Sequence, residues 1–189
     1  MLSETKSASG GKIAIACDHA GYQTKKQVIQ FLKESGYDYT DFGTNSDSSV
    51  DYPDFAFQVA EAVGQPHRVA PTVGTTPRGR PWGKYQRGIL ICGSGLGMCI
   101  AANKVKGIRA VTCNDTFTAE MSRRHNDANV LCLGAKVVKQ DNLIPIVKTW
   151  LETEFESEGG KSRHQRRLNK ISDYEIKNQK IKRKKIQPS

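Results

Sequence analysis

The chain has 189 residues, of which 37% are hydrophobic, enough for one well-buried core and too few for two large ones. Its formal charge of +10 belongs mostly to one end, because residues 161–189 hold 11 Lys and Arg against two acidic residues. No apolar run approaches the roughly 18 residues that span a bilayer, and residues 1–11 are too polar for a signal peptide. We therefore expect a single-domain, soluble protein of the cytoplasm.

The cysteines and histidines argue against disulfides and metals. The cysteines are Cys17, Cys92, Cys99, Cys113 and Cys132. Their number is odd, no C-x-x-C pair occurs, and most stand in apolar runs, which is typical of free thiols in a reducing compartment. The four histidines lack the spacings that zinc sites use, so we expect no metal.

Apolar runs and helical periodicity alternate along the chain. Strands are predicted at 12–18, 37–43, 88–93, 107–113 and 128–134, and helices at 19–36, 51–63, 95–105, 116–126 and 141–155. Gly36 is expected to end the first helix, and Pro53 stands near the start of the second, where its missing N–H does no harm. This alternation predicts an α/β protein with a doubly wound, five-stranded parallel sheet and helices on both faces.

Composition divides the chain into a leader (1–11), one domain (12–168) and a basic tail (169–189). Within the domain, residues 64–86 hold four prolines, four glycines and no acid, which indicates an irregular surface insertion. The KIKRKK run at 180–185 is interpreted as a solvated, partly disordered extension. A nuclear-import or polyanion-binding patch remains the alternative.

Ligands of doubly wound sheets bind beyond the carboxyl ends of the strands. That rule selects Asp18 and His19 after the first strand, residues 92–97 after the third, and Asn114 and Asp115 after the fourth.

The GSGLG stretch (93–97) opens a helix, where converging backbone N–H groups can form an anion site. A dinucleotide fingerprint is disfavoured, because Met98 stands in place of the last glycine and the strand is the third. A P-loop is excluded because no G-K-[ST] follows, and glycines that merely ease a tight turn remain an alternative.

Cys92 ends the strand before this turn, where the helix dipole can favour a thiolate, whereas Cys99 lies inside the helix and is not a candidate. The alternative is that Cys92 fills the core. A cysteine protease or transferase would have His125 available as its base, but the sequence assigns no third residue to orient that histidine. Arg163 and Arg167 stand four apart, so a helix would present both guanidinium groups on one face, suited to phosphate or simply solvated.

Taken together, the sequence resembles the family of type B ribose-5-phosphate isomerases, which includes galactose-6-phosphate isomerase subunits. The matching stretches are IACDHAGYQTK (15–25), SVDYPDFA (49–56), GILICGSGLGMCIAANKVKGIRA (88–110), SRRHNDANVLCLGAKVV (122–138) and RHQRRL (163–168). The resemblance implies a Rossmann-like fold, a homodimer or dimer of dimers with active sites shared between subunits, a phosphorylated pentose substrate and no metal or other cofactor. Partners of other kinds, membrane or nucleic acid, are not expected.

The resemblance also implies roles for single residues. Cys92 is the base that moves a proton between C1 and C2, and His125, with Asn126 beside it, opens the furanose ring. The remaining assignments are the enediolate site (Gly93, Ser94, Gly95, Gly97), the contacts to sugar hydroxyls (Asp18, Tyr52) and the phosphate ligands (His19, Arg163, Arg167).

Three features depart from the family pattern. Lys136 replaces an arginine that supports the phosphate in many members, so a bidentate contact becomes a point charge. The insertion at 64–86 and the basic tail are the other two. A different phosphorylated aldose, such as a 6-phosphohexose, remains the alternative substrate, and a polyanion-binding protein that uses the tail is the alternative of another class.

Overall fold

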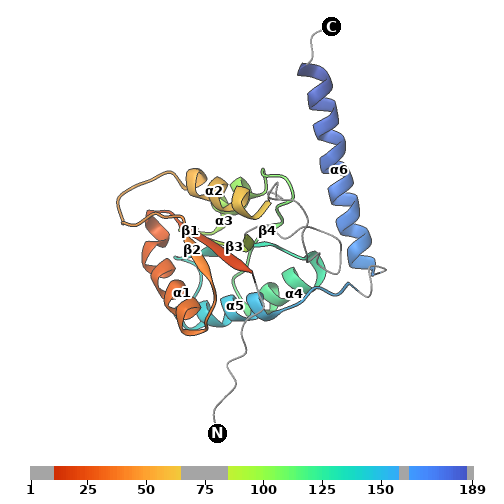
Figure 1. Ribbon diagram of the computed structural model, residues 1–189. Helices are drawn as coiled ribbons and strands as arrows, with labels where there is room; N and C mark the ends of the chain where they lie inside the picture. Colours follow the sequence, from red (N-terminus) through yellow and green to blue (C-terminus); the bar gives the residue numbers. More distant parts are fainter. Residues whose placement is uncertain (1–10, 65–84, 158–161, 187–189) are drawn as a thin grey trace.

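The computed structural model describes residues 11–64, 85–157 and 162–186. Its elements in chain order are β1 (Lys12–Cys17), the 3-10 turn η1 (His19–Gly21), α1 (Tyr22–Glu34), β2 (Tyr39–Asp41), α2 (Tyr52–Gly64), β3 (Tyr85–Cys92), α3 (Leu96–Ala102), β4 (Ala110–Thr112), α4 (Thr116–Asn126), β5 (Val130–Gly134), α5 (Gln140–Glu152) and α6 (Arg163–Ile186). The strands form one parallel sheet in the order β2-β1-β3-β5-β4 (Figure 1). The predicted five-stranded, doubly wound fold is confirmed.

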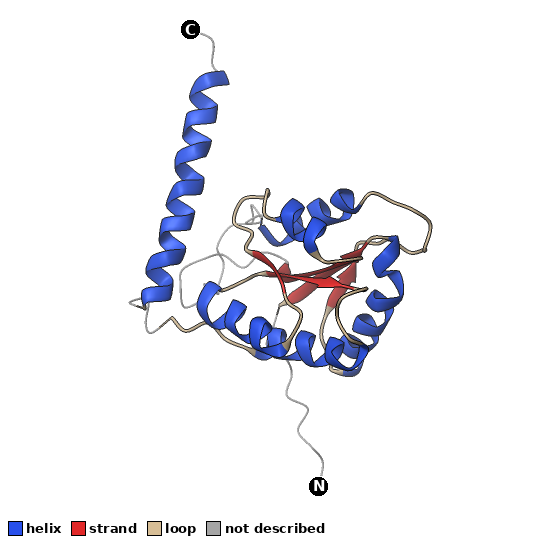
Figure 2. Ribbon diagram, turned by 180° about the vertical axis from the view of Figure 1, so that it is seen from behind, coloured by secondary structure: helices blue, strands red, loops and turns tan. Residues whose placement is uncertain are grey.

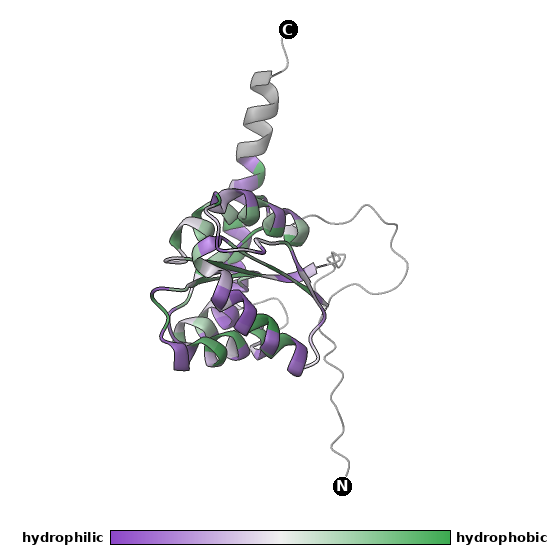
Figure 3. Cartoon of the chain, turned by 90° about the vertical axis from the view of Figure 1, so that its left-hand side faces the viewer, coloured by the Kyte–Doolittle hydropathy of each residue, from purple (hydrophilic) through white to green (hydrophobic). Residues whose placement is uncertain are grey.

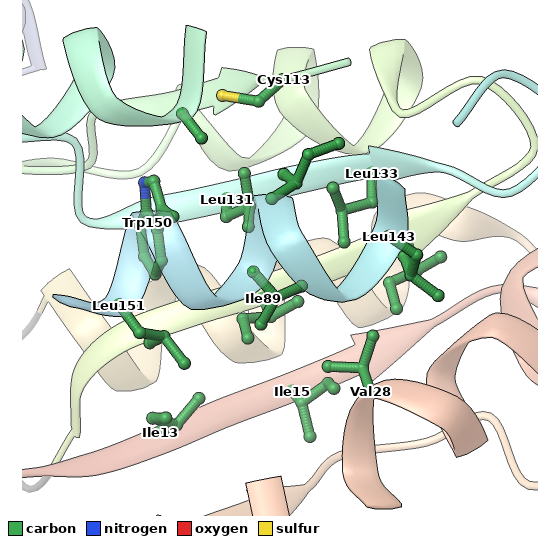
Figure 4. Packing of buried hydrophobic residues seen from close by; sticks show 14 of the residues in the cluster. Ile13, Ile15, Val28, Ile89, Cys113, Leu131, Leu133, Leu143, Trp150 and Leu151 are labelled. Atoms are coloured by element: carbon green, nitrogen blue, oxygen red, sulfur yellow. The ribbon is translucent and has the colours of Figure 1, made fainter. Parts of the chain in front are cut away.

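Helices cover both faces of the sheet (Figure 3). On β3, Ile89 and Ile91 belong to the apolar cluster that α1, α4 and α5 complete. Figure 4 shows this cluster, with Leu131 and Trp150 among its members. Leu90 alternates with these isoleucines and packs on the other side against α2 and α3. Both faces of β3 are therefore buried, which explains why its sequence is apolar without alternation.

The end of the first helix and the start of the second agree with the sequence prediction. Gly36 adopts a φ of 71°, and the N–H of Tyr37 donates to the carbonyl of Leu32, so the chain leaves α1 through a left-handed turn. Pro53 is the second residue of α2. Both expectations are confirmed.

The third strand begins earlier than the sequence indicates, because Tyr85 to Arg87 pair with β1. Tyr85 is buried, and its ring meets Phe42 edge to face at 5.5 Å. Gly64 closes α2, so both borders of the expected insertion at 64–86 were wrong by one to two residues. Residues 65–84 lie outside the described part of the chain.

The basic end of the chain differs from expectation. A single helix, α6, continues to Ile186 through the run at 180–185, which the sequence interpretation took as partly disordered (Figure 2). Long Lys, Arg, Gln and Glu side chains favour helix, and Glu175 accepts hydrogen bonds from the N–H of Gly107 at 3.0 and 3.2 Å. That contact ties the helix to the loop before β4. The division into leader, domain and tail stays a prediction.

None of the helices in the described ranges is both long enough and apolar enough to cross a membrane.

Candidate active site

The carboxyl edge of the sheet gathers the first group of predicted residues. Cys92 is the last residue of β3, which lies between β1 and β5, and it pairs with Gly134 of β5. Asp18 follows β1 directly, and its N–H donates to the carbonyl of Ile91 at 3.1 Å. The thiol therefore stands at the middle of this edge, only 4% exposed.

The turn after Cys92 closes over its sulfur. The N–H of Gly95 donates to Cys92 Sγ at 3.2 Å, and the N–H of Leu96 faces Ser94 Oγ at 3.4 Å. Gly95 has a φ of 79°, and a Cβ there would lie 3.0 Å from Thr112 Cγ2. The turn thus requires glycine at 95 on both conformational and steric grounds. An N–H donor aimed at sulfur is a suitable partner for a thiolate.

Asp18 and His19 are held by backbone groups. Asp18 Oδ1 accepts from the N–H of Gly21 at 3.0 Å and so caps the 3-10 turn. His19 Nδ1 accepts from the N–H of Val50 at 3.3 Å. In a neutral imidazole the proton then resides on Nε2, which makes that nitrogen the donor available to a ligand. Sequence reasoning did not identify Val50, because its role depends on a backbone contact with a residue 31 positions away.

Tyr52 and Lys136 complete this edge. A Cβ on Gly97 would lie 2.8 Å from the ring of Tyr52, so the ring rests directly on the glycine. The N–H of Lys136 donates to the carbonyl of Gly93 at 3.0 Å, and its side chain passes beside that glycine. The structure therefore brings together the predicted enediolate site, the hydroxyl contacts and two basic groups, namely Cys92, Gly93, Ser94, Gly95, Gly97, Asp18, Tyr52, His19 and Lys136.

The other four predicted residues, His125, Asn126, Arg163 and Arg167, are not at this edge. Helix α4 begins after β4 and runs back across the sheet, so His125 in its last turn lies near the amino ends of the strands. Arg109, which precedes β4, donates to the carbonyl of Asn126 at 3.0 Å and confirms that position. From Val130 to Gly134, β5 spans about 13 Å at roughly 3.3 Å per residue, so Cys92 and His125 of one chain lie at opposite ends of the strands.

A polar cluster surrounds His125. Its ring stacks on the ring of His164, with centroids 4.2 Å apart and planes inclined by 2°. Its Nε2 lies 3.9 Å from Glu156 Oε2. Arg124 pairs with Glu156, and Arg163 Nε donates to His164 Nε2 at 3.3 Å. Burial, followed by the nearby positive charges, lowers the pKa of His164.

Sequence reasoning missed Glu156, His164 and Arg124. The available signal was the position of His164 between Arg163 and Arg167, the two predicted phosphate ligands in RHQRRL.

The same cluster contains the three groups in the described chain whose ligand atoms could approach one metal ion. Those atoms of His125, Glu156 and His164 all lie within 4.8 Å of one another. Imidazole nitrogens bind metals in the ring plane, so two parallel stacked rings cannot both direct a lone pair at one ion without rotating. Arg124 donates a hydrogen bond to Glu156, and Arg163 donates one to His164, so these two ligand groups already have partners. The arrangement disfavours a metal, and the expected absence of one stays a prediction.

The remaining thiols divide into buried and half-buried groups. All five cysteines are free. Burial raises the pKa of Cys17 to about 11 and that of Cys132 well above its usual value, as expected for core thiols. Cys99 differs from expectation, because hydrogen bonds, first from Cys132 and then from Thr112 and Asn103, lower its pKa to about 6 despite its burial. Its Sγ nevertheless faces the carbonyl of Ala110, the first residue of β4, at 3.4 Å, and not the glycine turn after Cys92.

Taken together, the doubly wound sheet and the glycine turn at the carboxyl ends of its strands define an α/β protein whose ligand site lies beside Cys92, where a helix start suits an anionic group. Comparison with known proteins narrows this class.

The chain matches the Ribose/Galactose Isomerase family over residues 13–171. Ribose-5-phosphate isomerase B of Clostridium thermocellum is 47% identical, with a TM-score of 0.76 over 88% of this chain and 99% of that one. Ribose-5-phosphate isomerase B of Mycoplasma genitalium, solved with bound ribulose-5-phosphate, is 40% identical, with a TM-score of 0.73 over 87% and 96%. D-erythrulose-4-phosphate isomerase of Pectobacterium atrosepticum is 37% identical over 86% of this chain and 94% of its own length. The chain belongs to this family and is a sugar-phosphate isomerase.

Proposed function

We propose that the enzyme interconverts ribose 5-phosphate and ribulose 5-phosphate, a step of the non-oxidative pentose phosphate pathway, with Cys92 as the base. The observation that carries the proposal is the buried Cys92 thiol at the end of the central strand, facing the N–H of Gly95. The names of the Clostridium and Mycoplasma relatives support a pentose phosphate substrate. The free thiols fit a cytoplasmic location.

The chemistry is a proton transfer between neighbouring carbons. The Cys92 thiolate removes the proton from C2 of the open-chain aldose, and the electron pair moves through C1 onto O1, giving an enediolate. The amides of Gly93 to Gly97 and the hydroxyl of Ser94 stabilise the charge on oxygen. The thiol then returns the proton to C1 while the O2 proton moves to O1, which leaves the ketose. A positioned base contributes roughly 100 to 10,000-fold to such a step.

The remaining groups at this edge bind the sugar. Asp18 and Tyr52 contact hydroxyl groups, and the Nε2–H of His19 donates to the phosphate. Lys136 supplies a point charge nearby. In this proposal His125, with Asn126 beside it, opens the sugar ring. Arg163 and Arg167 bind the phosphate. None of these four residues lies at the carboxyl ends of the strands beside Cys92.

We propose that a second copy of the chain supplies those groups, so that each active site combines the Cys92 edge of one subunit with the His125 edge of its partner. The opposite positions of the two edges support this arrangement. Side chains next to the Cys92 edge offer an apolar docking surface, because Leu96, Ile100 and Phe117 are 59%, 62% and 68% exposed. Apolar surface of this kind is typical of an interface between subunits.

Mixed subunits test both proposals in one assay. Cys92→Ala and His125→Ala variants are each expected to be inactive on ribose 5-phosphate. When they are co-expressed, half of the dimers pair one variant with the other, and each such dimer regains one intact site of two. A shared site therefore predicts about a quarter of wild-type turnover for the mixture. Activity no greater than that of the single variants would show that the sites are not shared.

The substrate is the open part of the proposal, since the Pectobacterium relative is named for a four-carbon substrate. The alternative is another phosphorylated aldose or ketose, such as a 6-phosphohexose. Measuring kcat/KM for ribose 5-phosphate, erythrulose 4-phosphate and galactose 6-phosphate decides between them. A preference for either of the last two over ribose 5-phosphate would replace the pentose assignment.

A further inference from the structure

His125 is the proposed ring-opening group, and two neighbours fix its surroundings. Its Nε2 stands 3.9 Å from Glu156 Oε2, at ion-pair distance, while its ring face is covered by His164 at 4.2 Å. Both neighbours lie at the His125 end of the strands, away from Cys92. In the part of the chain that the structure describes, Glu156 contacts His125 and Arg124, and His164 contacts His125 and Arg163.

We propose that Glu156 and His164 are positioning residues for His125: the carboxylate orients its Nε2 and stabilises the imidazolium, and the stacked ring fixes its plane. The inference rests on the proposed role of His125 and assigns that role a direction, namely that of a general acid.

Glu156 is itself firmly held. Its N–H donates to the carbonyl of Arg124 at 3.0 Å, and Arg124 Nε donates to Glu156 Oε1 at 2.6 Å. One carboxylate oxygen is therefore committed to Arg124, and the other faces His125. The hydrogen bond from Arg124 also lowers the pKa of Glu156, so the carboxylate is ionised at neutral pH.

His164 is suited to be the neutral member of the stack. It is 5% exposed, and its Nε2 accepts from Arg163 Nε at 3.3 Å, so that nitrogen carries no proton. Its lowered pKa, caused by burial first and by neighbouring positive charge second, agrees with a neutral ring. A neutral aromatic face against an imidazolium is a favourable cation–π arrangement.

The other charges around His125 oppose a positive ring. Arg163 and Arg167 of α6 lie near His164, which stacks on His125, and Arg124 comes from α4, where Glu120 offsets it through a 2.8 Å contact. Glu156 is the carboxylate at ion-pair distance from the ring itself. Neutralising Glu156 therefore removes the carboxylate that faces the His125 ring.

The proton balance of ring opening follows from this assignment. Because Nε2 faces Glu156, the imidazolium gives its Nδ1 proton to the ring oxygen O4 as the C1–O4 bond breaks and its electron pair moves to O4. The O1 hydroxyl loses its proton to water as the C1–O1 double bond forms. The imidazole then regains a proton from solvent, so no cofactor or redox partner is required.

The test is the Glu156→Gln variant, compared with the wild type by NMR of 13C-labelled histidine at one fixed pH. The ring resonances of His125 are expected to move, because the carboxylate that faces Nε2 is lost. Glu156→Asp is expected to restore part of the difference. Glu154→Gln is the matched control, because Glu154 is 89% exposed and pairs with Arg87 at 4.0 Å instead. His125 resonances that are unchanged in Glu156→Gln, or that move equally in Glu154→Gln, would overturn the inference.

Kinetics supply the second readout. Glu156→Gln is expected to lower kcat for ribose 5-phosphate, which enters as a closed ring, several-fold more than for ribulose 5-phosphate, which is open-chain. Equal losses with both substrates would show that Glu156 acts only on structure. His164→Phe keeps an aromatic ring against His125 and is expected to keep the wild-type ratio of the kcat values for the two substrates. His164→Ala removes the ring and is expected to change that ratio more. The NMR result does not depend on turnover, so failure of the proposed isomerase activity would be recognised separately.

Discussion

The aromatic ring of Tyr52 rests on the α-carbon of Gly97, close enough that a Cβ at residue 97 would lie 2.8 Å from the ring. The first turn of α2 and the start of α3 therefore define one wall of the proposed sugar site together. Tyr52 is 40% exposed, so its ring can move outward without disturbing the core.

Replacing Gly97 with Ala is expected to displace the Tyr52 ring while leaving the fold intact. We expect KM for ribose 5-phosphate to rise several-fold, with little change in Tm, because a substrate contact is lost at the surface. Tyr52→Phe, which keeps the ring and removes the hydroxyl, separates the hydroxyl contact from ring position. A large fall in Tm for Gly97→Ala would instead mean that the ring cannot yield.

The thiol assignment is tested by a pair of cysteine variants. Cys92→Ala is expected to lower turnover at least 100-fold, the lower bound for loss of a positioned base. Cys99→Ala is the control and is expected to retain activity, because its Sγ faces Ala110 over β4. The lowered pKa of Cys99 makes this control stringent. Loss of activity in Cys99→Ala with full activity in Cys92→Ala would exchange their roles.

The phosphate contact is separable from the charge of the C-terminal run. Arg167→Ala is expected to weaken binding of ribose 5-phosphate by about 1.5 to 3 kcal/mol, the range for a charge-assisted hydrogen bond. Changing Lys182, Arg183, Lys184 and Lys185 together to Ala is expected to do far less. An equal rise in KM from both variants would mean bulk electrostatic steering, and it would favour the polyanion-binding alternative.

Stability at high pH is expected to depend on Cys17. This thiol is fully buried and faces the carbonyl of Thr44 at 3.8 Å, and burial raises its pKa from 9.0 to about 11. The unfolded chain loses the thiol proton first, so this contribution is fully present below pH 9 and disappears as pH rises to about 11. It amounts to about 2 to 3 kcal/mol at most. Denaturant unfolding of wild type and Cys17→Ala between pH 8 and 11 measures it, and parallel pH curves would contradict the assignment.

Local patterns were sufficient for the order of elements and for the Cys92 edge of the site. The buried strands are apolar runs, and glycines mark the turns, so strand ends such as Cys92 could be located from neighbours in sequence. The start of β3 could not, because Tyr85 to Arg87 are polar or mixed and become a strand only by pairing with β1. The length of α6 was missed for a similar reason, since its contact between Glu175 and Gly107 joins residues 68 apart.

The proposed division of the site between the two ends of the strands was implied by the family resemblance and could not be derived from spacing. His125 follows Cys92 by only 33 residues, yet α4 returns it to the opposite end of the strands. Glu156 and His164 illustrate the same limit, because their importance depends on a ring stack and a carboxylate contact that no local motif encodes.

The separation of Cys92 from His125 also determines how the enzyme should respond to dilution. In the proposed arrangement, a lone subunit carries the Cys92 base and the His125 ring-opening group at opposite ends of the strands of one sheet, so it would hold no complete site. Specific activity should therefore fall once the enzyme concentration drops below the subunit dissociation constant. In that range the concentration of dimer varies with the square of the subunit concentration. Association of the chain with itself would then set the lowest concentration at which the sugar phosphate is turned over.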